Sequence, residues 1–238
     1  MTYQKSFIRS VNALPENGID KTRTISFPGI LIILLIYTLI AGCSSNRNIR
    51  IGPGNIQSLN RELINVNSDP YTITVNIQEH SGLMMIKNLD FDFGILEFDL
   101  KGENKPGSSF LGLAFNIQND STYELVYFRP FNFNAPEEEA RNHGVQYVSE
   151  PQYPWHRLRA EYPGKFETNF IHPPAPDDWF TIRLHIHPEY ILIQDKRSRQ
   201  TLLKVDRLSE TRSKKIGFWT GTKSRGSFRN LNLIKVIQ

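Results

Sequence analysis

The feature that most constrains the fold is a pair of alternating runs within residues 110–133, FLGLAFNIQNDSTYELVYFRPFNF. In the first run, large apolar residues alternate with Phe110, Gly112, Ala114 and Asn116. In the return run, Val126 and Phe128 alternate with Tyr123, Leu125, Tyr127 and Arg129. A period of two residues is typical of a β-strand, because successive side chains point to opposite faces. With a polar turn at 118–122, these runs predict a β-hairpin that has one apolar face and one face of small, aromatic and cationic side chains.

The same alternation continues along most of the chain. We expect strands at 71–77, 82–87, 93–101, 145–149, 179–187, 190–195, 201–205, 215–221 and 227–236. Turn-forming residues separate these runs, and only 155–162 has a helical period. Many short strands with little helix predict an all-β fold, a sandwich or a barrel. Segment 134–178 is rich in proline and too long for a hairpin turn, so we expect a long Pro-rich loop insertion there.

The N-terminal region has the layout of an export signal. Four basic residues precede the apolar run 30–42, ILIILLIYTLIAG, and Cys43, the only cysteine of the 238 residues, follows it. This order predicts a signal peptide. Residues 40–43, IAGC, resemble the lipobox of bacterial lipoproteins, which implies cleavage after residue 42 and lipidation of Cys43. The alternative is an uncleaved anchor, although the run is shorter than the ~20 residues that span a bilayer.

The lipobox resemblance implies three segments: a lipoprotein signal peptide at 1–42, a lipidated tether at 43–51 and a single β-sandwich domain at 52–238. Ser44 instead of aspartate follows the cysteine, which implies the outer membrane of a bacterial cell envelope with two membranes. The partners expected are therefore a membrane, through the lipid anchor, and whatever the sandwich binds. The net charge is only +4, and the basic residues do not cluster into a stripe along the sequence. Nucleic acid is therefore not expected as a partner.

Several segments together resemble one known group of proteins. They are GILEFDLKG at 94–102, the hairpin region 109–133, DDWFTIRLHI at 177–186 and KIGFWTG at 215–221. These segments are similar to the concanavalin A-like lectin/glucanase superfamily, and most of all to bacterial lipoproteins with a 3-keto-disaccharide hydrolase-like domain. The resemblance covers residues 85–238. It implies a concanavalin A-like jelly-roll β-sandwich of two antiparallel sheets whose concave sheet holds a carbohydrate ligand.

Two carboxylates are candidates for catalysis. Glu97 and Asp99 are two residues apart on an expected strand, so their side chains share a face. Retaining glycosidases place two carboxyl groups about 5–5.5 Å apart, which such a pair can reach. Laminarinase-like members of the superfamily carry a Glu-x-Asp-x-Glu pattern, whereas the third position here is Lys101 or Gly102. The alternative interpretation is a solvated strand face on which Lys101 balances the two carboxylates.

A ligand site is predicted where the hairpin meets the insertion. Its candidate residues are Tyr127, Arg129, Asn116, His143, Gln146, Tyr147 and Trp155. Aromatic faces stack on the C–H surfaces of sugars, while Arg, Asn and Gln bond to hydroxyl pairs. The small residues of the hairpin are expected to leave space for the ligand. The alternative is that the insertion packs onto the sheet and fills this space.

The sequence gives no reason to expect a cofactor or a metal. His185 and His187 share a strand face, but no third ligand accompanies them. Three functions therefore stay open: carbohydrate binding, glycoside hydrolysis of a glycan or modified disaccharide by Glu97 or Asp99, and a structural or interaction module without a small ligand. An open hollow over Tyr127 and Arg129 is the observation that favours the first.

Overall fold

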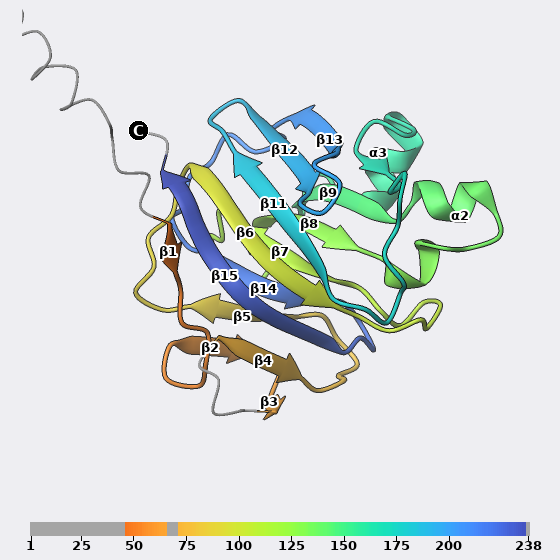
Figure 1. Cartoon of the computed structure of the whole chain (residues 1–238). Coiled ribbons are helices and arrows are strands. Elements are labelled where there is room, and N and C mark those ends of the chain that lie inside the picture. The colour runs from red at the N-terminus through yellow and green to blue at the C-terminus, as the bar shows by residue number, and fades with distance from the viewer. Residues whose placement is uncertain (1–45, 66–70, 237–238) are drawn as a thin grey trace, which may run out of the picture. The chain divides into compact units, whose positions relative to one another are not determined.

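Two antiparallel sheets face each other in the computed structural model, which describes residues 46–65 and 71–236 (Figure 1). The eight-stranded sheet contains, in spatial order, β13 (Thr201–Asp206), β12 (Tyr190–Asp195), β11 (Phe180–Ile186), β6 (Gly94–Lys101), β15 (Gly226–Val236), β4 (Thr72–Val75) and β3 (Leu63–Asn65), with β1 (Arg47–Asn48) paired to β15. The seven-stranded sheet contains β10 (Glu167–Thr168), β9 (Val145–Glu150), β8 (Tyr123–Phe128), β7 (Leu111–Phe115), β14 (Gly217–Thr220), β5 (Gly82–Ile86) and β2 (Ile56–Leu59). The predicted jelly-roll β-sandwich is confirmed.

The core lies between the two sheets, where the alternating apolar side chains meet. On β11, buried residues alternate with half-buried ones along the whole strand. Phe98 of β6 and Phe218 of β14 meet edge to face across the gap, with ring centroids 6.1 Å apart. Phe218 also stacks on Phe228 of β15 at 4.5 Å. These aromatic contacts join the sheets, so the alternating pattern of each strand determines which face looks inward.

The predicted hairpin is present as β7 and β8. Leu111 lies opposite Phe128, and Gly112 lies opposite Tyr127. A Cβ atom at Gly112 would sit only 2.1 Å from the backbone oxygen of Val126. Gly112 therefore permits a close approach of the two strands and does not leave the open space above the sheet that the sequence suggested.

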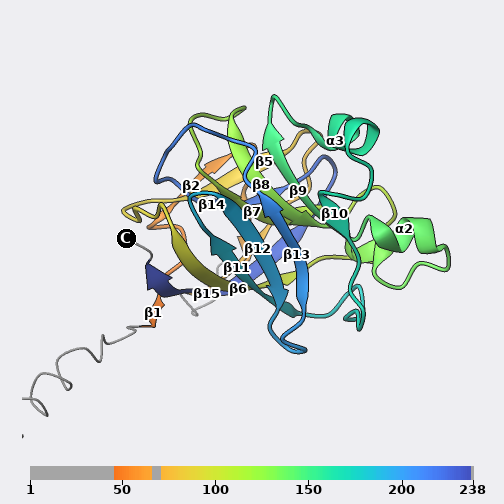
Figure 2. The ribbon, with the colours of Figure 1, turned by 90° about the horizontal axis from the view of Figure 1, so that it is seen from above.

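The Pro-rich segment 134–178 forms several regular elements and not one long loop, and the strand expected at 145–149 is confirmed within it. It contains the helix α2 (Glu138–Asn142), strand β9, the helix α3 (Trp155–Glu161) and strand β10, and the short 3₁₀ helix η1 (Pro130–Asn132) precedes it. The two strands extend the seven-stranded sheet at its edge, beside which α2 and α3 lie (Figure 2). The helix expected at 155–162 is confirmed. Prolines such as Pro154, which caps α3, mark the boundaries of these elements and do not indicate an unstructured insertion.

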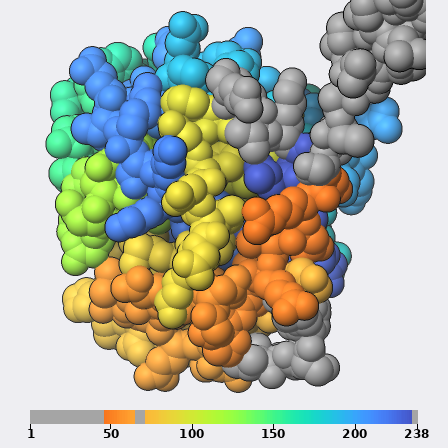
Figure 3. All heavy atoms as spheres, turned by 90° about the vertical axis from the view of Figure 1, so that its left-hand side faces the viewer, coloured from red at the N-terminus to blue at the C-terminus, as the bar shows by residue number. Residues whose placement is uncertain are grey.

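The sandwich begins before residue 52, where the sequence analysis placed its start. Arg47 pairs with Leu233 of β15, and Ile51 is fully buried in the core. In Figure 3 this segment lies against the rest of the sandwich. Residues 47–51 are therefore part of the fold and not a tether. The predicted signal peptide and Cys43 lie outside the described residues. No helix of the described part is long and apolar enough to cross a membrane.

We expect Gly112→Ala to destabilise the domain, because the added methyl group would collide with the backbone of β8. Overpacking of this kind raises the free energy of the folded state by about 1–3 kcal/mol. Denaturant unfolding measures the effect. Gly54→Ala is the matched control, because no atom lies within 4 Å of the position its methyl group would take. Equal stability of the two variants would show that the close approach at Gly112 is not needed.

Candidate functional site

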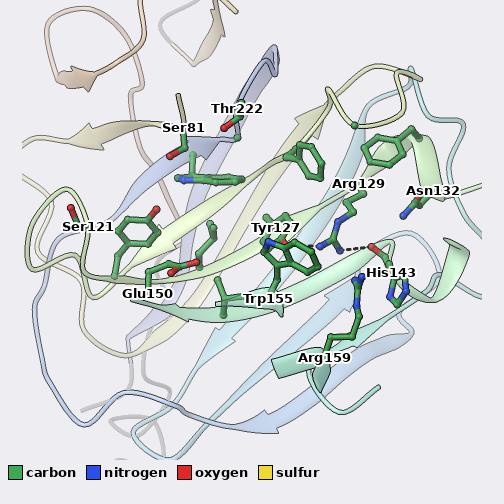
Figure 4. A pocket seen from close by; sticks show the side chains of 18 of the residues that line it. Ser81, Ser121, Tyr127, Arg129, Asn132, His143, Glu150, Trp155, Arg159 and Thr222 are labelled. Carbon is green, nitrogen blue, oxygen red and sulfur yellow. Dashed lines mark hydrogen bonds between the residues drawn. The ribbon is translucent and has the colours of Figure 1, made fainter. Parts of the chain in front are cut away.

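A pocket of about 730 Å³ opens on the outer face of the seven-stranded sheet (Figure 4). Its floor is made by the side chains of β8 that point away from the core, namely Tyr123, Leu125 and Tyr127, and by Arg129 just beyond the strand. Val126 and Phe128 alternate with these residues and belong to the core. Tyr123 and Arg129 are six positions apart, so the pocket extends along the strand for about 20 Å.

Arg129 forms one end of the pocket. Pro130 begins the 3₁₀ helix directly after it, so Arg129 follows the last residue of the extended strand. Its guanidinium donates hydrogen bonds to the backbone oxygen of His143 at 2.6 Å and to the hydroxyl of Tyr127 at 2.6 Å. A longer bond of 3.4 Å reaches Oε1 of Gln146. Only 6% of Arg129 is exposed, and this burial lowers the pKa of its guanidinium.

Helix α3 supplies the wall next to Arg129. Trp155 and Arg159 are four residues apart and therefore lie on one face of the helix, with the guanidinium of Arg159 5.0 Å from the Trp155 ring centre. Arg159 also binds Glu167 of β10 through two hydrogen bonds of 3.1 and 2.8 Å. Nδ1 of His143 lies 2.8 Å from the same carboxylate. Trp155 is 45% exposed, so its ring is available to a ligand.

Glu150 marks the opposite end of the pocket. It is the last residue of β9, lies opposite Tyr123 in the register, and lines the pocket together with Ser121 of the β7–β8 turn (Figure 4). Partial burial raises the pKa of its carboxyl group, and the charge of His156 acts in the other direction. The Glu150 carboxylate makes no hydrogen bond or ion pair with another described residue. It is therefore an acceptor that can bind the hydroxyl groups of a ligand.

Aromatic rings form a continuous surface between these two ends. The ring of Tyr127 lies 5.4 Å from Trp219 and 6.4 Å from Phe110, which in turn contacts Phe131 at 5.4 Å. Burial raises the pKa of Tyr127 to about 12, so its hydroxyl stays protonated at neutral pH. The pocket thus combines apolar ring faces with hydrogen-bonding and charged groups at both ends.

Four of the predicted site residues come together in this pocket, namely Tyr127, Arg129, His143 and Trp155. Gln146 faces the same side of the sheet but lies beneath Arg129, where it is 1% exposed. The sequence analysis missed Glu150, Arg159, Phe110 and Trp219. The alternation would have indicated Trp219, because it neighbours the core residue Phe218 and must point to the other face.

Two predicted ligand residues lie away from the pocket, and these predictions need correction. Tyr147 points into the sandwich, where it stacks on Phe115 and donates its hydroxyl to the buried carboxylate of Glu124. Asn116 donates to the same carboxylate at 2.8 Å, and Arg207 forms an ion pair with it. Both predictions failed because the side chains complete a buried polar network around Glu124, which no ligand over the pocket can contact.

The two candidate catalytic carboxylates also lie elsewhere, on the outer face of the eight-stranded sheet. Glu97 forms ion pairs with Arg183 at 2.8 Å and with Lys196 at 2.5 Å. Asp99 accepts hydrogen bonds from three neighbours, which are Thr181, Arg229 and Asn230. Glu97 and Asp99 are therefore not part of the pocket, and glycoside hydrolysis by them stays an untested prediction. Their charges are balanced by Arg183, Lys196 and Arg229 and not by Lys101, and with 6% and 7% exposure they do not form the solvated face of the alternative.

Comparisons with known proteins support the fold and go no further. No protein-family model matches the chain, and no curated protein matches it. Among solved structures, a Bacillus subtilis protein of unknown function with a galectin-like fold is 11% identical, with a TM-score of 0.53, and covers 81% of this chain and 100% of its own. The carbohydrate-binding module CBM66 of Bacillus subtilis is 9% identical, with a TM-score of 0.52 and coverage of 75% and 95%.

A third similar structure is the exoplasmic/lumenal domain of VIP36 in its Ca²⁺/Man₃GlcNAc-bound form. It is 9% identical, with a TM-score of 0.51, and the match covers 82% of this chain and 90% of that domain. At such low identities these likenesses establish a jelly-roll β-sandwich fold and no shared residues. Within the described residues, no three His, Cys, Asp or Glu side chains gather in a way that could hold a metal ion.

We expect Glu150→Gln to raise the thermal stability of the protein at pH 7 and to leave it unchanged at pH 3. The folded-state pKa of Glu150 is raised, so the folded protein binds this proton more tightly than the unfolded chain does. The resulting destabilisation is absent below the unfolded pKa of about 4.3. It develops as the pH rises through the folded-state pKa. Calorimetry at both pH values measures the difference, and a loss of stability at pH 7 would contradict the assignment.

Proposed function

We propose that this protein binds carbohydrate in the pocket over the seven-stranded sheet. The observation that carries the proposal is the pairing of an exposed aromatic ring, Trp155, with hydrogen-bonding groups at both ends of one open pocket. Sugar rings have apolar C–H faces that pack on aromatic rings, and hydroxyl edges that need donors and acceptors. Arg129 and Glu150 supply a donor and an acceptor on either side of the aromatic surface.

The similar folds support this proposal. CBM66 is named as a carbohydrate-binding module, and the VIP36 domain was captured with a mannose-containing oligosaccharide. The match covers 95% of the CBM66 chain and 90% of the VIP36 chain. Fold alone does not determine function, so the weight of the proposal lies on the pocket and its side chains.

A non-catalytic structural module is the second candidate, and the burial of two site residues favours it. Tyr127 is 4% and Arg129 is 6% exposed, as expected if the segment after β8 packs down on the sheet. However, α2 and α3 do not fill the space above these residues, because the pocket remains open beside them. Ligand binding is the property that separates the two candidates.

We also propose that Cys43 is lipidated and anchors the protein to the bacterial cell envelope, at the outer membrane. The support is the lipobox-like segment after a basic and apolar N-terminal region. The described sandwich would then be held near a membrane surface by acyl chains, which bind membranes stably when more than one is attached.

Trp155→Ala is expected to weaken binding on a glycan array by about tenfold or more, equivalent to about 1.4 kcal/mol. The reason is that the variant removes the exposed aromatic face of the pocket. Because Trp155 is exposed, the unfolding temperature should not change. Trp179→Ala is the matched control, since this tryptophan packs under Arg229 beside the eight-stranded sheet. A Trp155→Ala protein that binds glycans as tightly as the unchanged chain would refute the proposed surface.

Cys43→Ser is expected to abolish incorporation of radiolabelled palmitate and to release the protein from the membrane fraction. The hydroxyl of serine cannot replace the thiol that the lipid-transfer reaction uses. The measurement is metabolic labelling followed by membrane fractionation of bacterial cells that express the full chain. Ser44→Ala serves as the control and should remain labelled. Labelling that persists in Cys43→Ser would rule out the proposed anchor.

A further inference from the structure

We propose that the pocket selects an acidic sugar, whose anionic group, a carboxylate or a sulfate, lies against Arg129. This inference deepens the proposed carbohydrate binding and rests on it. It concerns the chemical class of the ligand and the direction in which the ligand lies. Three observations carry it: the unused donors of Arg129, the balance of charge around it, and the position of Glu150 at the far end.

A comparison of two buried arginines shows that Arg129 is incompletely bonded. Arg61 is 5% exposed and Arg129 is 6% exposed. The five N–H donors of Arg61 all have acceptors, which are the hydroxyl of Thr220 and four backbone oxygens. Arg129 makes three hydrogen bonds, one of them long, and its Nε–H and one Nη1 hydrogen donate to no described residue. Arg61 is therefore a structural group, whereas Arg129 retains donors for a ligand.

The charge around Arg129 is also unbalanced. Arg129 forms no ion pair with a described residue, and Glu167, the carboxylate that influences it, is already bound by Arg159. This end of the pocket thus contains two guanidinium groups and one carboxylate, which is bound to Arg159 and not to Arg129. A buried cation without a paired anion is unfavourable, because burial removes its hydration. The rings of Tyr127 and Phe110, whose centres lie 4.7 and 5.9 Å from the guanidinium, offset part of this desolvation cost by cation–π attraction. An anion from the ligand would complete the pair.

Glu150 sets the orientation of such a ligand. It lies at the end of the pocket that is about 20 Å from Arg129 along β8. Asp120 lines the same end. A negative group is repelled there and attracted to Arg129, while neutral hydroxyl groups can donate to the free Glu150 carboxylate. The pocket is therefore bipolar, and the anionic residue of the sugar is expected at the Arg129 end.

The first experiment uses the unchanged full chain and needs no substitution. An array carries uronic-acid oligosaccharides, each beside its carboxyl-reduced neutral counterpart, and sulfated galactans beside their desulfated forms. We expect the acidic member of at least one pair to bind about tenfold or more tightly, the usual effect of one charge-assisted hydrogen bond. The carboxylate and sulfate pairs identify which anionic group the pocket takes.

The outcomes of this array separate the two proposals. Equal binding of acidic and neutral members would overturn the acidic-sugar inference and leave carbohydrate binding intact. Binding to none of the glycans would overturn both. A preference for neutral members would likewise overturn the inference, because it would show that the charge of Arg129 is not used.

Variants then test whether Arg129 is the residue that recognises the anionic group of the sugar. Arg129→Met is expected to reduce the acidic-to-neutral affinity ratio about tenfold or more, and Arg129→Lys to reduce it less, since lysine keeps the charge. Arg183→Met is the matched control, because this arginine belongs to the eight-stranded sheet and should leave the ratio unchanged. An unchanged ratio in a folded Arg129→Met protein would overturn the assignment of Arg129.

Glu150→Gln keeps the test valid even if the buried Arg129 does not tolerate substitution. It removes a negative charge from the opposite end without touching Arg129. The acidic-to-neutral affinity ratio should therefore stay the same or rise, because the lost hydroxyl acceptor affects both members and the lost charge repels only the acidic one. A loss of the acidic preference in this variant would contradict the bipolar arrangement.

Discussion

Strand β8 is the element on which the rest of the structure depends, because it belongs to the core and to the pocket at once. Val126 and Phe128 face the eight-stranded sheet, whereas Tyr127 faces the pocket. A shift of its register by one residue would exchange these faces and remove both the core contact and the pocket floor. The close approach at Gly112 and the pairing with β9 on the other side hold this register in place.

Buried charge is handled in two different ways on the two faces of the same sheet. Inside the sandwich, Glu124 pairs with Arg207 and accepts hydrogen bonds from Asn116 and Tyr147, so its charge is compensated within the fold. On the pocket side, Arg129 has aromatic neighbours, one backbone acceptor and two side-chain acceptors, but no described carboxylate forms an ion pair with it. The first arrangement pairs the charge within the fold, and the second leaves donors of Arg129 that the described residues do not use.

The site was partly predictable for a specific reason. Tyr127 and Arg129 follow from the alternation of one strand, and Trp155 follows from its residue type, because aromatic faces stack on sugar rings. Tyr147 and Asn116 were misassigned, because neither the register of β9 against β8 nor the left-handed backbone conformation of Asn116 can be read from residue order. Glu150 and Arg159 were missed, because their roles come from neighbours that are distant in the sequence.

The alternation of the chain by itself determined an all-β fold and the location of most strands, because a period of two residues is a local property of an extended backbone. Only the tertiary structure decided that segment 134–178 completes a sheet and that Glu97 and Asp99 stand on the opposite face from the pocket. It also decided that Arg129 and Glu150 mark two ends of one pocket. These facts depend on strand order and pairing between distant segments, which local residue patterns do not encode.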